Sequence, residues 1–188
     1  MPDHAKRDFD QGAVNKVWIS DITYLHTAEG WLYLCAVRDG HSRRVLGWAT
    51  DQTQTSDLVE KALRMAYTQR GGACQGVIFH ADRGSQFTSG QTQKVCKELG
   101  LKPSVGKTGV CYDNAMQESF WSTLKTEYYN RNRFTTREQA TKAVGRWIEN
   151  NYNSRRRHSA LNMLTPKEFE DFEILAKLKK QASELVSA

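Results

Sequence analysis

The sequence predicts a mixed α/β domain, built on a five-stranded sheet with helices on its faces. Three observations support this: strand-like runs joined by short turns, a buried run that ends in a loop, and helical periodicity in the segments around them. The 188 residues are enough for one domain with a substantial core, and not obviously for two. The chain is 39% hydrophobic and 26% charged, which is typical of a folded protein and unlike a disordered one.

The first three strands are predicted from apolar runs. They are VWISDITYL at 17–25, WLYLCAVRD at 31–39 and RVLGWATD at 44–51. Short turns that contain Gly30 and Gly40 join these runs, as in an antiparallel meander.

Two further strands are predicted downstream. Ser56 or Asp57 is suited to cap a helix that follows the meander. The run GVIF at 76–79 predicts a fourth strand, and LKPSV at 101–105 predicts a short fifth one. A helix is expected between them, over 89–99.

Two later helices are predicted from capping patterns. Asn114 is followed by Gln117, and Thr135 by Glu138, each pair at the spacing of a capping box. The resulting order is three strands, helix, strand, helix, strand and helices. This order matches the ribonuclease H-like fold, with the first strand in the centre of the sheet.

Three segments are expected along the chain. Residues 1–14 form a polar lead-in, residues 15–170 form the core, and residues 171–188 form a C-terminal helical tail. We expect a cytoplasmic protein, because no run approaches the roughly 18–20 apolar residues of a membrane span and the N-terminus lacks the apolar core of a secretory signal. The four cysteines are scattered without zinc-ligand spacing, which favours reduced thiols.

Positive charge is concentrated in one part of the chain, whose formal net charge is +6. Residues 101–160 hold 11 Lys and Arg against 5 Asp and Glu, whereas residues 1–100 hold 12 against 11. The basic block is also rich in aromatic residues and Asn, which favours nucleic acid as a partner, since phosphates and base faces are what nucleic acids expose. A basic face that only keeps the protein in solution is the alternative.

Two aspartates occupy unusual places in the predicted strands. Asp82 follows a buried run directly, and Arg83 to Ser85 predict a tight loop after it. Open α/β sheets carry their chemistry at the carboxyl ends of strands, although an Asp there often only bonds its own loop. Asp21 lies in mid-strand, where a buried carboxylate must be paired, protonated or bound to a metal. An edge strand that exposes Asp21, or an ion pair with an Arg, is the alternative.

The helix that begins near Asn114 has two sides when its residues are placed 100° apart. An apolar side is formed by Phe120, Trp121, Leu124 and Tyr128. Glu118 and Lys125 lie on a polar stripe, almost two turns apart. A polar face without function would show the same stripe.

Four segments carry a resemblance to a known family. They are WISDITYL, HADRGSQFTS, CYDNAMQESFWSTLKTE and YNSRRRHSALNMLTPKEF. Together they resemble the catalytic domain of bacterial insertion-sequence transposases of the OrfB type (the IS-three family), which belong with the retroviral-type integrase cores. The signature of these cores is Asp, Asp and, after 35 intervening residues, Glu; Asp82 and Glu118 have this spacing. Lys125 matches the basic residue seven positions after the Glu.

The resemblance implies a polynucleotidyl transferase whose catalytic and metal-binding residues are Asp21, Asp82 and Glu118. Two Mg²⁺ ions per active site are expected, with Mn²⁺ able to substitute, because hard oxygen ligands suit these cations. In such enzymes water first frees a 3′-OH at the element end, and this 3′-OH then attacks a target phosphodiester.

DNA, both as element ends and as target, is the implied partner. The expected DNA-binding residues are Lys107, Lys125, Arg155, Arg156, Arg157 and His158. A homo-oligomer on DNA and association with the nucleoid are also expected, without any membrane. Because nothing before Val17 has the pattern of a helix-turn-helix, we expect a separate protein or region to supply recognition of the ends.

Other functions are compatible with part of the pattern. A hydrolytic nuclease of the same fold would cut without joining, and a non-catalytic remnant would only bind DNA. A tyrosine recombinase would need a nucleophile such as Tyr128 or Tyr129, but Tyr128 falls on the apolar side of its helix, which favours packing. Tyr129 falls nearer the polar stripe, where it would be able to touch DNA.

Overall fold

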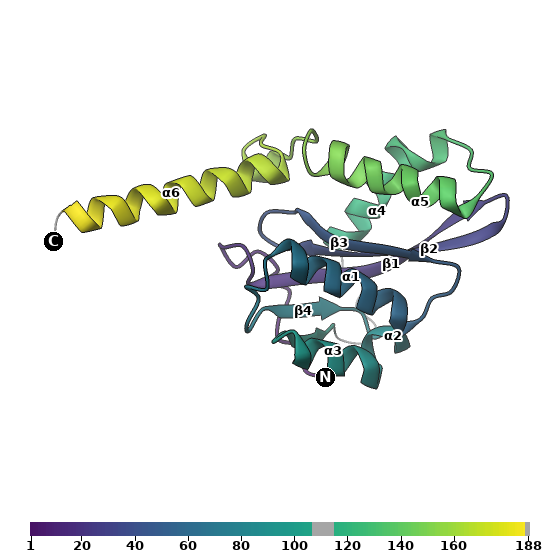
Figure 1. Ribbon diagram of the computed structural model, residues 1–188, viewed down its shortest axis with the longest axis horizontal. Coiled ribbons are helices and arrows are strands. Elements are labelled where there is room, and N and C mark those ends of the chain that lie inside the picture. The colour runs from purple at the N-terminus through teal and green to yellow at the C-terminus, as the bar shows by residue number, and fades with distance from the viewer. Residues whose placement is uncertain (107–114, 187–188) are drawn as a thin grey trace.

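A mixed five-stranded sheet runs through the molecule, with helices on both of its faces (Figure 1). The computed structural model describes residues 1–106 and 115–186. The strands are β1 (Val17–Thr27), β2 (Gly30–Asp39), β3 (Val45–Asp51), β4 (Ile78–Ala81) and β5 (Lys102–Val105). Their spatial order is β3-β2-β1-β4-β5; β1 to β3 form the predicted antiparallel meander, and β4 and β5 run parallel to β1.

The helices form two groups around this sheet. They are α1 (Ser56–Gln69), α2 (Ser85–Thr88), α3 (Gly90–Glu98), α4 (Ala115–Glu127), α5 (Arg137–Arg146) and α6 (Pro166–Val186), with short segments η2 (Tyr129–Arg131), η3 (Trp147–Tyr152, π-helical) and η4 (Ser159–Leu161). α1 and α3 cover one face, α4 and α5 cover the other, and α6 projects away from the sheet (Figure 1). Within the described ranges, no helix is both long and apolar enough to cross a membrane.

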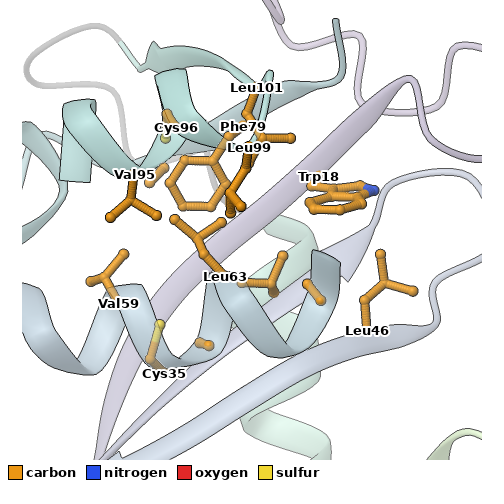
Figure 2. Close-up of a cluster of buried hydrophobic side chains, with 14 of the residues drawn as sticks. Trp18, Cys35, Leu46, Val59, Leu63, Phe79, Val95, Cys96, Leu99 and Leu101 are labelled. Carbon is orange, nitrogen blue, oxygen red and sulfur yellow. The ribbon is translucent and has the colours of Figure 1, made fainter. Parts of the chain in front are cut away.

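Two apolar clusters hold the helices against the sheet. The cluster beneath α1 and α3 includes the buried side chains of Trp18, Leu63 and Phe79 (Figure 2). The cluster on the opposite face includes Phe120 and Leu124 of α4. Complete burial of one such side chain contributes about 1.5–3 kcal/mol to stability, so α4 is firmly held on the sheet.

The two sides predicted for α4 are observed. Phe120, Trp121 and Leu124 are buried, and the half-buried Tyr128 stacks on Trp147 with 6.2 Å between ring centroids. Packing is therefore the role that the structure gives to Tyr128.

The cap of α5 differs from the prediction by one residue. Thr136, and not Thr135, accepts a hydrogen bond from the backbone N–H of Gln139, whose side chain completes the capping box in place of Glu138. Both threonines satisfy the local pattern, so the choice is made by how the next turn docks on the β1–β2 hairpin. Asn114, the predicted cap of α4, lies outside the described residues.

Segments near both ends of the chain pack on the core. In the N-terminal lead-in, Ala5 and Phe9 are buried against the start of β1. Near the start of α6, Glu170 is 4% exposed and accepts two hydrogen bonds from the guanidinium of Arg70, at 2.6 and 2.8 Å. Residues 171–186 therefore continue a helix whose first turn is fixed to the core.

Candidate active site

Asp21 lies in β1, just beyond the part of this strand that pairs with β4. That pairing extends only from Val17 to Ile19. Its Oδ2 accepts a hydrogen bond of 2.9 Å from Trp121 Nε1, and its Oδ1 accepts one of 2.8 Å from the backbone N–H of Ile22. β1 is the central strand, and the described residues form no ion pair with Asp21. Both alternative interpretations of Asp21 therefore disagree with the structure: Asp21 is not on an edge strand, and it forms no ion pair with a described Arg.

Asp82 follows the last residue of β4 and is exposed. Its Oδ1 accepts a hydrogen bond of 2.9 Å from the backbone N–H of Gly84, so it also shapes its own loop. Because β1 and β4 are parallel neighbours, Asp21 and Asp82 lie toward the same end of the sheet.

Glu118 is exposed in the first turn of α4, and buried polar contacts fix that turn on the sheet. Gln117 is fully buried, and its Nε2 donates to backbone carbonyls of β1 and β2 at 3.2 and 3.3 Å. Arg38, which is 4% exposed, donates from Nη1 to the Met116 carbonyl at 2.7 Å. The position of Glu118 relative to β1 is thus set by its immediate neighbours in the chain.

The three carboxylates interact electrostatically. Burial is the largest influence on Asp21, and together with the negative charges of Asp82 and Glu118 it raises the pKa of Asp21 to about 6. The hydrogen bonds from Trp121 and Ile22 act in the opposite direction, since they favour the charged carboxylate. The structure therefore places Asp82 and Glu118 within electrostatic range of Asp21, although the three acids are 61 and 36 positions apart in the sequence.

The chemistry of this donor set fits a hard divalent cation. Three carboxylates supply the oxygen ligands that Mg²⁺ prefers, and no Lys or Arg among the described residues forms an ion pair with any of them. As they are placed, no three His, Cys, Asp or Glu side chains in the described parts of the chain are close enough to hold an ion. Closer approach of the carboxylates is opposed by their mutual repulsion, which a bound cation would relieve.

Lys125 lies on the same side of α4 as Glu118 and is half-buried. Its Nζ is 4.6 Å from the centroid of the Tyr24 ring, a cation–π contact with β1. Burial lowers the pKa of Lys125, and the charge of Asp21 partly offsets this effect. Lys125 is therefore near the acids without being bonded to one.

The other predicted DNA-binding residues form a separate group, with Lys107 outside the described residues. Arg155 and Arg157 are exposed, and Arg157 donates to the Met163 carbonyl. Arg156 forms an ion pair with Glu127 at the end of α4.

His158 is half-buried, and its Nε2 has no hydrogen-bond partner among the described residues. Burial, reinforced by the charges of nearby arginines, lowers the pKa of His158 to about 4, so the ring is neutral near pH 7. No hydrogen bond or ion pair within the described residues joins this group to Asp21, Asp82 or Glu118.

Sequence patterns missed the residues that support the acids. Trp121 was assigned to the apolar side of α4, but its indole N–H also holds Asp21. In the sequence, Arg38 looks like an ordinary charged residue near the end of a strand. Its position within an apolar run is the one feature that indicates burial. Tyr129, expected near the polar stripe, is instead largely buried: it is 5% exposed, and its hydroxyl donates to the His26 carbonyl at 3.0 Å.

Comparisons with known proteins identify the family to which the chain is similar. Two family models, both described as integrase core domain, match residues 11–111 and 99–166. The chain is 40% identical over 171 residues to the 31 kDa protein of insertion element IS600 from Shigella sonnei, covering 90% of this chain and 62% of that protein. It is 40% identical over 174 residues to the transposase of IS904 from Lactococcus lactis (91% and 67%) and 42% identical over 166 residues to transposase InsF of IS3A from Escherichia coli (88% and 57%). The matched part thus spans between 57% and 67% of these relatives.

Solved structures share the fold. A chain of the simian T-cell lymphotropic virus intasome, in complex with PP2A regulatory subunit B56 gamma, aligns with a TM-score of 0.61 at 20% identity, over 81% of this chain and 58% of that one. The catalytic core domain of BIV integrase aligns with a TM-score of 0.58 at 20% identity, over 87% and 99%. Such retroviral cores are ribonuclease H-like, so the predicted fold class is confirmed.

Proposed function

The chain belongs to the integrase core domain family, and we propose that it is the catalytic domain of a DDE transposase, which cleaves DNA at 3′ ends and transfers the freed strand. One observation carries the proposal: the charges of Asp82 and Glu118 both act on Asp21 at one end of the sheet. The relatives that are named transposases support the same activity.

In this proposal the chain's own residues prepare the site for a phosphodiester. Asp21, Asp82 and Glu118 bind metal, and Trp121 orients the Asp21 carboxylate through its 2.9 Å hydrogen bond. Lys125 binds a DNA phosphate as a point charge near the acids.

We assign Mg²⁺ as the cofactor, two ions per site, with Mn²⁺ able to replace it. Bound divalent ions neutralise phosphate oxygens and activate an attacking oxygen, which is the chemistry that the carboxylates alone lack. The supporting observation is a set of three acids without a cationic partner among the described residues.

The partners in this proposal are DNA, further copies of the chain and a source of end recognition. A homo-oligomer on DNA is part of this proposal; one structural neighbour is a chain of a viral intasome. A helix-turn-helix protein or region would select the element ends. Arg155, Arg156, Arg157 and His158 would bind phosphate, and a DNA substrate of this kind would place the protein in the cytoplasm, at the nucleoid.

The test is a joining assay with a labelled duplex that carries the terminal repeat bordering the gene, a plasmid target and Mg²⁺. Asp21→Asn, Asp82→Asn and Glu118→Gln should each abolish cleavage and joining, while DNA affinity and melting temperature stay close to wild type. Glu138→Gln, an exposed carboxylate of α5, is the matched control and should retain full activity.

Three outcomes would contradict the proposal. If Glu118→Gln joined DNA almost as well as the wild type and still required metal, Glu118 would not be a catalytic residue. Cleavage without joining by the wild type would favour a hydrolytic nuclease. Tight DNA binding without either reaction, in the presence of Mg²⁺ or Mn²⁺, would favour a non-catalytic DNA-binding protein.

A further inference from the structure

A groove of about 580 Å³ lies between the β1–β2 hairpin and the end of α4. Its lining includes the aromatic side chains of Tyr24, His26 and Trp31 and the cations Lys125 and Arg133; we call it the aromatic groove. Its volume falls within the range of about 300–1,000 Å³ that is usual for small-ligand sites. The catalytic residues proposed above do not line it.

The aromatic side chains of this groove are unusually open to solvent. Tyr24 is 58% exposed and Trp31 is 48% exposed, although large aromatic rings are normally buried. Trp31 meets Tyr24 at 5.2 Å and 86°, and His26 at 5.3 Å and 84°. Because the rings meet edge to face and not in parallel stacks, part of their flat surface stays available for another planar group.

The charge of the aromatic groove is positive. Lys125 reaches over the Tyr24 ring at 4.6 Å, and Arg133, which also lines the groove, is exposed. No Asp or Glu occurs among the described residues that line the groove. A ligand with a planar apolar part and a negative part would satisfy both features.

The groove is also close to the acids. Tyr24 lies three residues after Asp21 on β1, which is about 10 Å at 3.3 Å per residue. Lys125 is near both, since it contacts Tyr24 and its pKa responds to Asp21. The groove therefore lies close to the place where the acids would hold a DNA strand.

We propose that the aromatic groove binds an unpaired nucleotide of the DNA strand held at the active site, with its base stacked on Trp31 and Tyr24 and its phosphate against Lys125 and Arg133. The inference rests on the proposed DNA substrate and extends it to single-stranded DNA. Base pairs inside a duplex present only their edges, so a base from within the strand must be unpaired to stack in the groove. Every base has a flat face, so the groove would tolerate different sequences.

The experiment compares two duplexes of identical sequence, one blunt and one with a single-stranded tail of a few nucleotides. Affinity is measured by fluorescence anisotropy, and stacking by the quenching of 2-aminopurine placed in the tail. Wild-type protein should bind the tailed duplex more tightly and quench the probe. Trp31→Ala should lower affinity for the tailed duplex about tenfold and abolish quenching, while affinity for the blunt duplex stays unchanged. Trp31→Phe should restore part of both effects, and Phe172→Ala, which changes a more exposed aromatic of α6, should have no effect.

The outcomes separate this inference from the proposed function. If Trp31→Ala lost affinity for both duplexes, or still quenched the probe, the proposed role of the aromatic groove would be wrong, even if the wild type cleaves and joins DNA. The same would follow from an absence of preference for the tailed duplex in the wild type. If the acid-to-amide variants still joined DNA, the catalytic assignment would be wrong, but the binding measurements on the groove would keep their meaning. Melting temperatures of all variants show whether an effect on binding comes from unfolding.

Discussion

Arg38 Nη1 donates a hydrogen bond of 2.9 Å to Gln117 Oε1, at the residue that immediately precedes Glu118. Both side chains are buried, and the Arg38 guanidinium also lies 4.8 Å from the centroid of the Phe120 ring. Its other partners are neutral: the Met116 and Arg43 carbonyls and the Tyr152 hydroxyl. A positive charge without a carboxylate partner among the described residues thus fixes the first turn of α4 against the central strands.

Replacing Gln117 should affect both stability and catalysis. Gln117→Leu removes the acceptor for Arg38, and an unsatisfied buried donor costs about 1–3 kcal/mol. We expect the free energy of unfolding in urea to fall by that amount, and strand transfer to fall more than DNA affinity, because Glu118 loses its fixed position. Gln117→Glu keeps the acceptor for Arg38 but loses the Nε2 donor to the carbonyls of Ile19 and Ala36, so it should restore only part of the lost stability. Wild-type stability of Gln117→Leu would show that the hydrogen bond does not hold the turn.

The basic run after η3 should govern the salt dependence of DNA binding. Each phosphate contact contributes about 0.9 to the slope of log affinity against log salt. Replacing Arg155, Arg156 and Arg157 together by Gln should therefore reduce the magnitude of that slope by about 2–3. The charge-matched control replaces Lys177, Lys179 and Lys180 of α6, and an equal reduction there would indicate non-specific attraction.

The attachment of α6 should depend on its buried acid. Glu170 accepts hydrogen bonds from Arg70, Arg44 and Ser42, and removing one partner of a buried ion pair typically costs about 3–5 kcal/mol. Glu170→Gln should lower the free energy of unfolding by a comparable amount. Asp171→Asn, an exposed neighbour on the same helix, should change it by less than about 0.5 kcal/mol. Similar effects of the two substitutions would contradict a specific role for Glu170.

Stability should also depend on pH through His41, which contacts Asp10 and Glu173. Burial lowers the pKa of His41, but its hydrogen bonds to the two acids outweigh this and raise it above the usual value. Because the pKa of His41 is higher in the folded state, protonated His41 stabilises the fold. This contribution to stability is complete below about pH 6.5, the pKa in the unfolded state, and disappears as the pH rises through the folded-state pKa.

The measurement is the difference in unfolding free energy between wild type and His41→Gln across this range. The difference should be largest near pH 5.5–6 and should shrink as the pH rises through the raised pKa of His41. A difference that grows with pH would show that His41 contributes in its neutral form.

The sequence by itself determined the local elements of this protein. An apolar run predicts β1, and the spacing of Phe120, Trp121 and Leu124 predicts the packed side of α4. Such patterns depend on residues a few positions apart, so they are readable without a fold. The 35-residue interval between Asp82 and Glu118 is likewise a property of the sequence alone.

Only the tertiary structure decided which side chains support those elements. Arg38 and Gln117 are 79 positions apart, and their hydrogen bond exists because α4 packs across β1 and β2. The choice of Thr136 over Thr135 as a cap, and the meeting of Trp31 with Arg133 in one groove, depend equally on docking against the β1–β2 hairpin. These contacts form because segments that are distant in the sequence pack together. The packing energy depends on all of these segments at once, so no local stretch of the sequence predicts it.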